Sequence, residues 1–458
     1  MTDLLVLAAF VVGGLPIGLL LLTRVQALLA AAIISSVLAT VAAVLHVALD
    51  LPIGLIWVVL VLASVTVITL VPRLRTRVMA NLRQPVGGQE YLHLSITGVL
   101  VLFVAVLVPA PIAWDARSIW LFHGSWLTGP AVDYLDGLAL PELVFSHPDY
   151  PLLGPGSMAV TWNLTGQAED LTNGVRLIAL LSLSAVAFVA TATLSRITRD
   201  VHPVLTSLAF VLFTTSVLPL AAGLLDEGYL DAMQAAYVVA LVAVLLPSLH
   251  ERMPWRSAML ASILAVAAVN VKQEGFWFVL AVLCSFLVVS FRTQNVAKYV
   301  PLAVTLGAYG VWKVFLAANG AIDTSDASGI AGKLPELVTP GSRAWEVLGR
   351  LAATEWAIHV LPVLIVLLLA LCGYFVLRRD PSRLRTALFL LIAWLGLNVI
   401  VMLTYALGDS RDVLDWWLAT SFVRVIATAL LLAFFAVMVV VVSVPAWRSE
   451  STKAEVVA

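Results

Sequence analysis

The chain has 458 residues, of which 62% are hydrophobic and only 12% are charged, and its formal net charge is −1. A soluble protein of this length needs a larger charged fraction on its surface, and a balanced charge offers no basic surface for nucleic acid. The composition therefore predicts a membrane protein that has the lipid bilayer, and no nucleic acid, as a partner. The two cysteines lie in apolar runs and indicate neither a disulfide framework nor a metal cluster.

Apolar segments of about twenty residues recur along the whole chain, and each can cross roughly 30 Å of hydrocarbon. The first of them, from Leu4 to Leu22, has no basic segment before it and is predicted to be a span rather than a cleaved signal peptide. We predict an all-α, polytopic transmembrane helical bundle of about thirteen spans: 4–22, 27–49, 51–71, 92–110, 173–194, 203–222, 229–249, 257–270, 275–291, 298–317, 352–377, 385–407 and 422–444.

The basic residues indicate the orientation of these spans. When the spans are counted alternately, four basic clusters fall on one side: "RLRTRVMANLR" (73–83), "HERMPWR" (250–256), "FRTQNVAK" (291–298) and "RRDPSRLR" (378–385). By the positive-inside rule this side is cytoplasmic. The N-terminus is then predicted outside, the C-terminus inside, and residues 111–172 form the longest external loop. The Ala/Val/Leu-rich, Lys-poor composition suggests a bacterium, and hence its cytoplasmic (inner) membrane.

The external loop opens with "WDARSIWLF", in which Asp115 and Arg117 follow the fourth span directly. Asp115 is a candidate functional carboxylate at the membrane edge, although an ordinary loop aspartate or the N-cap of a short interfacial helix would explain it too. An aromatic belt at headgroup depth is suggested by Trp114, Trp120, Phe122 and Trp126.

Further along the same loop, "HPDYPLL" places His147, Asp149 and Tyr150 between two prolines that stiffen the chain. These three side chains are candidates for binding a polar substrate. His147 has no partner at the spacing of metal ligands, so no metal site is predicted.

The next external connection, "LLDEGYLD" (224–231), carries the acidic residues Asp226, Glu227 and Asp231 within six positions. Acids crowded near a low dielectric cost free energy unless a cation or a proton donor meets them. They are candidate site residues, and a solvated loop is the alternative.

A third candidate is "NVKQEG" (270–275), with Lys272 and Glu274. The span before it has about fourteen residues and reaches only about 21 Å, so both side chains should lie in a polar recess of the bundle. An ionisable pair at such a depth indicates function, unless it is a structural Lys–Glu pair or a tilted helix end. Arg411 and Arg424 flank "DWW" near the last span, where they would hold a lipid phosphate or simply anchor the helix.

The sequence contains no P-loop, dinucleotide fingerprint, GxSxG or HExxH motif. The order and common side of "WDARSIW", "HPDYPLL", "DEGYLD" and "VKQEG" resemble the GT-C superfamily of integral-membrane glycosyltransferases, in particular bacterial family-39-like members. The resemblance implies that Asp115 is the catalytic aspartate, that Asp226 and Glu227 form the second acidic motif, and that no metal cofactor is needed. Three extra spans before the catalytic loop and the lack of a soluble C-terminal domain depart from the family pattern.

On this basis the chain divides into an extra N-terminal three-helix region (1–91), a GT-C-like seven-helix catalytic module (92–317) and an external loop with a C-terminal three-helix region (318–458). The resemblance implies transfer of a sugar from a polyprenyl-phosphate-linked donor to an envelope glycan, lipid or protein acceptor, with Asp115 as general base. The alternatives are a transporter or flippase of lipid-linked or small polar cargo, and a noncatalytic scaffold.

Overall fold

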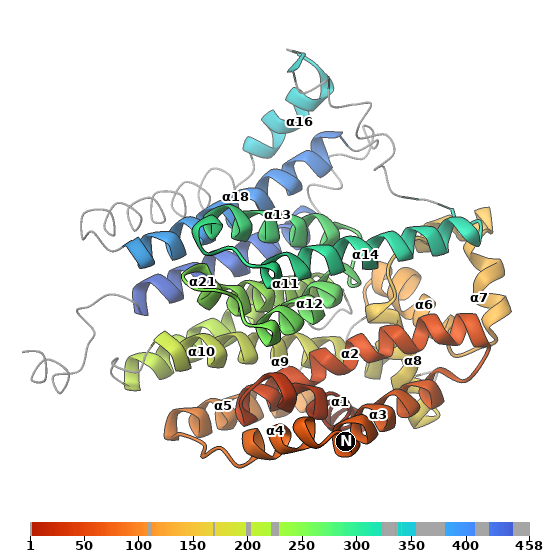
Figure 1. Ribbon diagram of the computed structural model, residues 1–458. Helices are drawn as coiled ribbons and strands as arrows, with labels where there is room; N and C mark the ends of the chain where they lie inside the picture. Colours follow the sequence, from red (N-terminus) through yellow and green to blue (C-terminus); the bar gives the residue numbers. More distant parts are fainter. Residues whose placement is uncertain are drawn as a thin grey trace, which may run out of the picture.

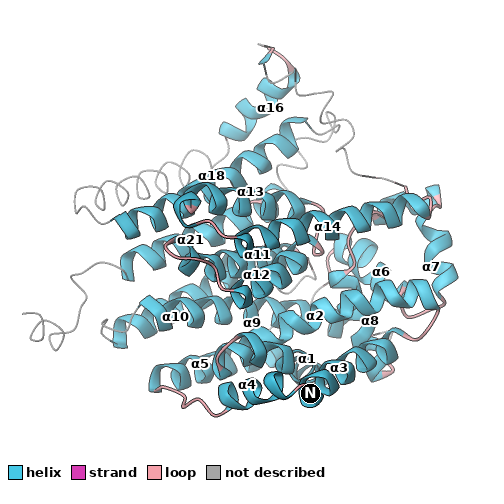
Figure 2. Cartoon of the chain, in the orientation of Figure 1, coloured by secondary structure: helices cyan, strands magenta, loops and turns pink. Residues whose placement is uncertain are grey.

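The computed structural model describes residues 2–107, 112–167, 170–197, 203–220, 229–322, 324, 335, 338–339, 341–353, 381–407 and 421–442. Within these ranges every regular element is a helix, and no strand is present (Figures 1 and 2). The all-α class predicted from the apolar runs is therefore confirmed.

The long elements are α1 (Thr2–Leu21), α2 (Arg24–Leu49), α3 (Ile53–Leu70), α5 (Gly88–Leu107), α9 (Leu171–Ile197), α10 (Pro203–Leu220), α11 (Asp231–Leu245), α12 (Trp255–Val269), α13 (Glu274–Val289), α14 (Val296–Ala318), α18 (Pro381–Leu407) and α21 (Ala427–Val442). The short elements are α4 (Pro72–Leu82), η1 (Ala116–Leu121), α6 (Phe122–Trp126), α7 (Ala131–Leu138), η2 (Pro141–Ser146), α8 (Leu153–Thr165), η3 (Leu246–Leu249), η4 (Phe291–Thr293), α16 (Arg343–Ala352) and α20 (Phe422–Val425).

Eight helices in the described ranges are long and apolar enough to cross a membrane, judged by length and composition, and shorter apolar helices accompany them. They indicate a multi-pass membrane protein. The count of thirteen spans stays a prediction, and the span expected at 352–377 lies almost wholly outside the described residues.

The helices are apolar around most of their circumference, which suits burial in a bundle or contact with lipid. Every residue of α11 is buried, so this helix lies at the centre of the bundle. The peripheral helices α3 and α14 instead expose apolar side chains such as Leu62 and Val311. Small residues allow close helix packing: a Cβ atom added to Gly14 of α1 would lie only 1.9 Å from the carbonyl oxygen of Ala31 in α2.

Most long helices run roughly parallel or antiparallel to one another, so their connections meet at two opposite ends of the bundle (Figure 1). At one end, which we call the acidic end, Asp50 Oδ1 accepts a hydrogen bond from the backbone N–H of Ala131 at 2.9 Å. The backbone N–H of Leu153 donates to the carbonyl of Asn270 at 2.9 Å. The helical segments between η1 and α8 lie at this end.

The other end, which we call the basic end, holds the described parts of the basic clusters, namely 73–83, 250–256, 291–298 and 381–385. Asn81 Nδ2 in α4 donates to the carbonyl of Leu19 at 2.7 Å, and His250 Nε2 lies 3.1 Å from Thr386 Oγ1 of α18. The described basic residues therefore pack at one end, as predicted, whereas residues 378–380 of the fourth cluster lie outside the described residues. Which end faces the cytoplasm stays a prediction.

The segment predicted as a long external loop folds much more than the sequence indicated. It contains five helical elements, and α8 packs against α2, α3, α6 and α9 with every residue from Leu153 to Trp162 buried. The expected aromatic belt stays a prediction, but its residues differ in burial. Trp114 is 67% exposed, whereas Trp120 is 3% exposed because its ring stacks on Tyr150 with a centroid distance of 5.1 Å.

Candidate functional site

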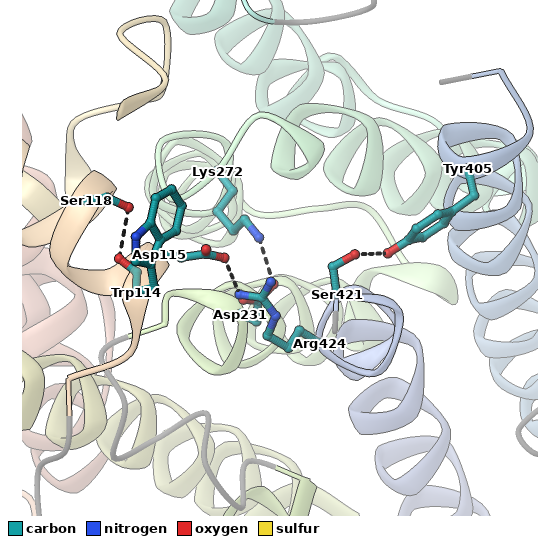
Figure 3. A network of polar contacts seen from close by, with 8 residues as sticks. All are labelled: Trp114, Asp115, Ser118, Asp231, Lys272, Tyr405, Ser421 and Arg424. Atoms are coloured by element: carbon teal, nitrogen blue, oxygen red, sulfur yellow. Dashed lines mark hydrogen bonds and ion pairs between the residues drawn. The ribbon is translucent and has the colours of Figure 1, made fainter. Parts of the chain in front are cut away.

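At the acidic end, Asp115 meets an arginine from the other end of the chain. Arg424 Nη1 in α20 donates to Asp115 Oδ2 at 2.7 Å across 309 residues of sequence (Figure 3). Their side chains keep 15% and 25% of their surface exposed. Asp115 immediately precedes η1, a π-helical segment, and such segments are frequent at functional sites. The first predicted candidate is therefore held by a specific cation.

A second ion pair forms beside the first, between Lys272 and Asp231. Lys272 Nζ donates to Asp231 Oδ1 at 2.8 Å, and both side chains are largely buried. Asp231 is the first residue of α11 and Lys272 follows the C-terminal end of α12. The helix dipoles favour an anion at the first position and a cation at the second, so local backbone structure stabilises both charges.

Glu274 lies in the same cluster but does not form the Lys–Glu ion pair that the sequence suggested. It is the first residue of α13, and its Oε2 atom is buried without a hydrogen-bond partner. Burial by itself would lower the pKa of Lys272, but the carboxylates of Asp231 and Glu274 outweigh it and raise that pKa above its usual value. The ammonium therefore remains charged throughout the neutral range.

Aromatic and hydroxyl side chains fix the arginine segment in place. The guanidinium of Arg424 lies over the ring of Tyr229 at 4.1 Å from its centroid, a cation–π contact. One turn of chain earlier, Ser421 Oγ is 2.8 Å from the hydroxyl of Tyr405 at the end of α18. Figure 3 shows Asp115, Lys272 and Arg424 converging from three separate segments.

The motif "HPDYPLL" forms the neighbouring wall. Asp149 is 1% exposed, and its two carboxylate oxygens accept hydrogen bonds from Gln273 Nε2 and from Thr324 Oγ1. The indole N–H of Trp312 donates to its backbone carbonyl at 3.2 Å. His147 Nδ1 lies 2.9 Å from Thr324 Oγ1.

The rings of Trp120, Tyr150 and His147 stack in that order, with the second pair 4.6 Å apart. Burial raises the pKa of Tyr150 well above its usual value, and the carboxylates of Glu274 and Asp149 add to that effect. The phenol therefore stays neutral and able to donate a hydrogen bond.

Most of the predicted site residues meet in this cluster. Those present are Asp115, His147, Asp149, Tyr150, Asp231, Lys272, Glu274 and Arg424. Arg117 is exposed on the first turn of η1 and has no contact with the two ion pairs. The predicted residues Asp226, Glu227 and Arg411 lie outside the described residues.

Sequence reasoning missed the residues that join the candidates to one another. Gln273 and Thr324 hold Asp149, and Tyr229 holds Arg424. Gln273 lies in the motif "VKQEG" and Tyr229 in "DEGYLD". Their positions next to charged candidates could therefore have identified them as site residues. No sequence feature identified Thr324, because a single threonine in a polar segment is common.

In the described part of the chain, no group of three or more His, Cys, Asp or Glu side chains is arranged to hold a metal ion. Comparisons of the chain with protein-family models, with curated proteins and with solved structures gave no match. Fold and site together define an all-helical, multi-pass membrane protein with ionised residues gathered at one end of its bundle. The arrangement offers carboxylates that can accept a proton beside cations that can meet an anion.

Proposed function

We propose that this protein is a membrane glycosyltransferase that transfers a sugar from a polyprenyl-phosphate-linked donor to a cell-envelope glycan, lipid or protein. Its site would face the extracytoplasmic side of the bacterial cytoplasmic membrane. The observation that carries the proposal is the 2.7 Å contact between Asp115 and Arg424. It joins the candidate base to a candidate phosphate-binding group, as the GT-C-like motifs lead one to expect.

In the proposed reaction an acceptor hydroxyl attacks the anomeric carbon of the donor sugar. The new C–O bond forms while the bond to the phosphate oxygen breaks, and that oxygen leaves with the electron pair. Asp115 takes the hydroxyl proton as general base, a role worth about 10²- to 10⁴-fold in rate. Arg424 and Lys272 stabilise the charge that develops on the departing phosphate.

The ion pairs bear on how the donor binds. Arg424 and Lys272 already have carboxylate partners, so a donor phosphate must compete with Asp115 and Asp231 for them. A phosphate that becomes the counter-ion of Arg424 would release Asp115 for proton transfer. Donor binding would thereby activate the base.

The position of the charges supports this proposal over a transporter. Transporters place their ionisable binding groups near the middle of the membrane, where both sides can reach them in turn. Here the two ion pairs lie at helix ends, with Asp231 at the start of α11 and Lys272 beyond α12. Both pairs lie at the acidic end of the bundle, which suits chemistry carried out from one side of the membrane.

The test is sugar transfer in reconstituted vesicles supplied with radiolabelled polyprenyl-phosphate sugars and an envelope extract as acceptor. Wild type should consume one donor, Asp115→Asn should lose at least about a hundredfold of the rate, and activity should survive EDTA. Glu346→Gln, a change in the exposed pair with Arg350, is the matched control and should remain active.

Two outcomes would contradict the proposal. Full activity of Asp115→Asn would show that Asp115 is not the general base. A labelled donor that crosses the vesicle membrane without being consumed would favour the transporter.

A further inference from the structure

His147, Thr324 and Asp149 form a hydrogen-bonded chain in which Thr324 lies in the middle. Thr324 Oγ1 lies 2.5 Å from Asp149 Oδ1 and 2.9 Å from His147 Nδ1. Gln273 Nε2 donates to the other oxygen of Asp149. Both carboxylate oxygens therefore act as acceptors, as in the ionised form.

The proton inventory fixes the tautomer of the histidine. A carboxylate only accepts, and a threonine hydroxyl has a single proton to give, so that proton points to Asp149. The hydroxyl oxygen can then only accept from the imidazole, and Nδ1 of His147 must carry a hydrogen. In a neutral imidazole this leaves Nε2 with a free lone pair.

The surroundings of His147 keep the imidazole neutral. Burial lowers the pKa of His147 below its usual value of 6.5, and Lys272 acts in the same direction. The carboxylates of Asp149, Glu274 and Asp115 oppose this shift without cancelling it. The ring stacks on Tyr150 at a centroid distance of 4.6 Å, and in the described part of the chain Nε2 has no hydrogen-bond partner.

The backbone of His147 adopts a strained conformation. Its φ of 52° lies in the left-handed region, which is unfavourable for a residue other than glycine, and Pro148 restricts the backbone further. The hydrogen bonds of His147 N to Val144 O and of Tyr150 N to His147 O hold the turn. Such strain is commonly found where a side chain must be aimed.

We propose that His147 Nε2 accepts a hydrogen bond from a hydroxyl group of the substrate, with Thr324 and Asp149 as positioning residues that fix the imidazole tautomer. The inference rests on the proposed function and deepens it, because it assigns a polyhydroxylated ligand to this wall of the site. The hydroxyl belongs either to the donor sugar or to the acceptor, and the two sources are separable by experiment.

The first experiment reads the tautomer without any turnover. Protein with ¹⁵N-labelled histidine is placed in lipid nanodiscs, and the signal of His147 is identified among the seven histidines by its absence in His147→Asn. At pH 7.5 we expect a protonated Nδ1 and an unprotonated Nε2. Thr324→Val should mix the two tautomers and Thr324→Ser should restore one. A protonated Nε2 in the wild type would overturn the proposal.

The same signal identifies the source of the hydroxyl. The labelled protein is titrated with undecaprenyl-phosphate sugars, with undecaprenyl phosphate alone, and with the envelope extract. A shift of the Nε2 signal with the sugar-bearing lipid only assigns the hydroxyl to the donor, and a shift with the extract assigns it to the acceptor. No shift with either would overturn the proposal, whether or not sugar transfer is detected.

Kinetics provide the third readout. His147→Asn keeps a hydrogen-bond donor near Thr324, but its shorter side chain has no acceptor at the position of Nε2. The value of kcat/KM should therefore fall about tenfold to a hundredfold at every pH. His147→Gln keeps an acceptor that cannot be protonated, and should retain most activity. Protonation turns Nε2 into a donor, and the pKa is lowered, so the wild type should lose activity only below about pH 6.5. Retention of that acidic limb in His147→Gln, or full activity of His147→Asn, would contradict the proposal.

Discussion

The two ends of the bundle hold their helices together by different means. At the acidic end, side chains from distant segments meet as ions, in the pairs Asp115–Arg424 and Lys272–Asp231. At the basic end, the described helix ends are joined by hydrogen bonds to backbone groups: Asn295 exchanges hydrogen bonds with both backbone groups of Met253, and the Arg77 guanidinium donates to the carbonyl of Leu20. Both ends are well packed, so the fold does not require ion pairs to join helix ends.

This contrast shows where function is concentrated. A buried ion pair often stabilises a protein no more than apolar side chains of the same size would, because desolvation offsets the attraction. Neutral hydrogen bonds give comparable order at a lower desolvation cost. Charges that the fold could dispense with are therefore best explained by what they do to a ligand.

The largest expected effect is at Asp231. Asp231→Ala leaves the Lys272 ammonium buried without its partner, which should cost about 3–5 kcal/mol of unfolding free energy and abolish transfer. The double variant Asp231→Ala/Lys272→Met should regain most of the stability and none of the activity. Thermal unfolding in detergent and the vesicle assay measure the two quantities. A single variant as stable as wild type would show that the pair is not formed.

At the basic end the opposite pattern is expected. Asn295→Ala removes the partners of the buried Met253 N–H and C=O groups, which should cost about 1–3 kcal/mol. Transfer per folded molecule should not change, because Asn295 lies at the far end from the site. Thermal unfolding and the vesicle assay again provide the measurements. If activity fell more than stability, the division of roles between the ends would be wrong.

A smaller effect is expected at the ring that supports Arg424. Tyr229→Leu removes the cation–π contact, worth about 0.5–2 kcal/mol, and should raise KM for the lipid donor by roughly 2- to 30-fold. Tyr229→Phe keeps the ring face and should behave nearly as wild type. Steady-state kinetics over a range of donor concentrations distinguish these variants, and an equal loss in both would assign the effect to the phenolic hydroxyl.

The smallest effect is expected at an exposed ion pair. Glu346 and Arg350 lie one turn apart on α16 with an N–O distance of 2.9 Å, and their side chains are 55% and 44% exposed. Glu346→Gln should change the unfolding free energy by only about 0.3–0.5 kcal/mol, with no change in transfer. A loss of more than 1 kcal/mol would mean that ion pairs stabilise this protein wherever they occur.

The sequence predicted the helices and several of the site residues because each of these depends on local properties. A long apolar run forms a helix whatever its partners are, and an ionised residue beside such a run is costly wherever it packs. Asp115, Lys272 and Arg424 could therefore be named as candidates. The alternation of spans also predicted correctly that the described residues of the basic clusters pack at one end.

The partners could not be predicted, because they depend on how distant helices pack. No sequence feature indicates that Asp115 contacts a residue 309 positions away. Nor does any feature indicate that Lys272 pairs with Asp231 rather than with Glu274, which is closer in sequence. The helix α8 was missed for a local reason. Its opening "LGPG" contains two glycines and a proline, residues that usually indicate a turn rather than a helix.

The burial of α8 affects how the topology of this protein can be mapped. The ten residues from Leu153 to Trp162 are buried within a connection between two helices, so single cysteines placed there would resist membrane-impermeant thiol reagents added to either side of the membrane. A labelling map would record this stretch as an additional crossing, and the orientation assigned to every later helix would be inverted. Reporter positions on the exposed surfaces of η2 and α7 would avoid that error.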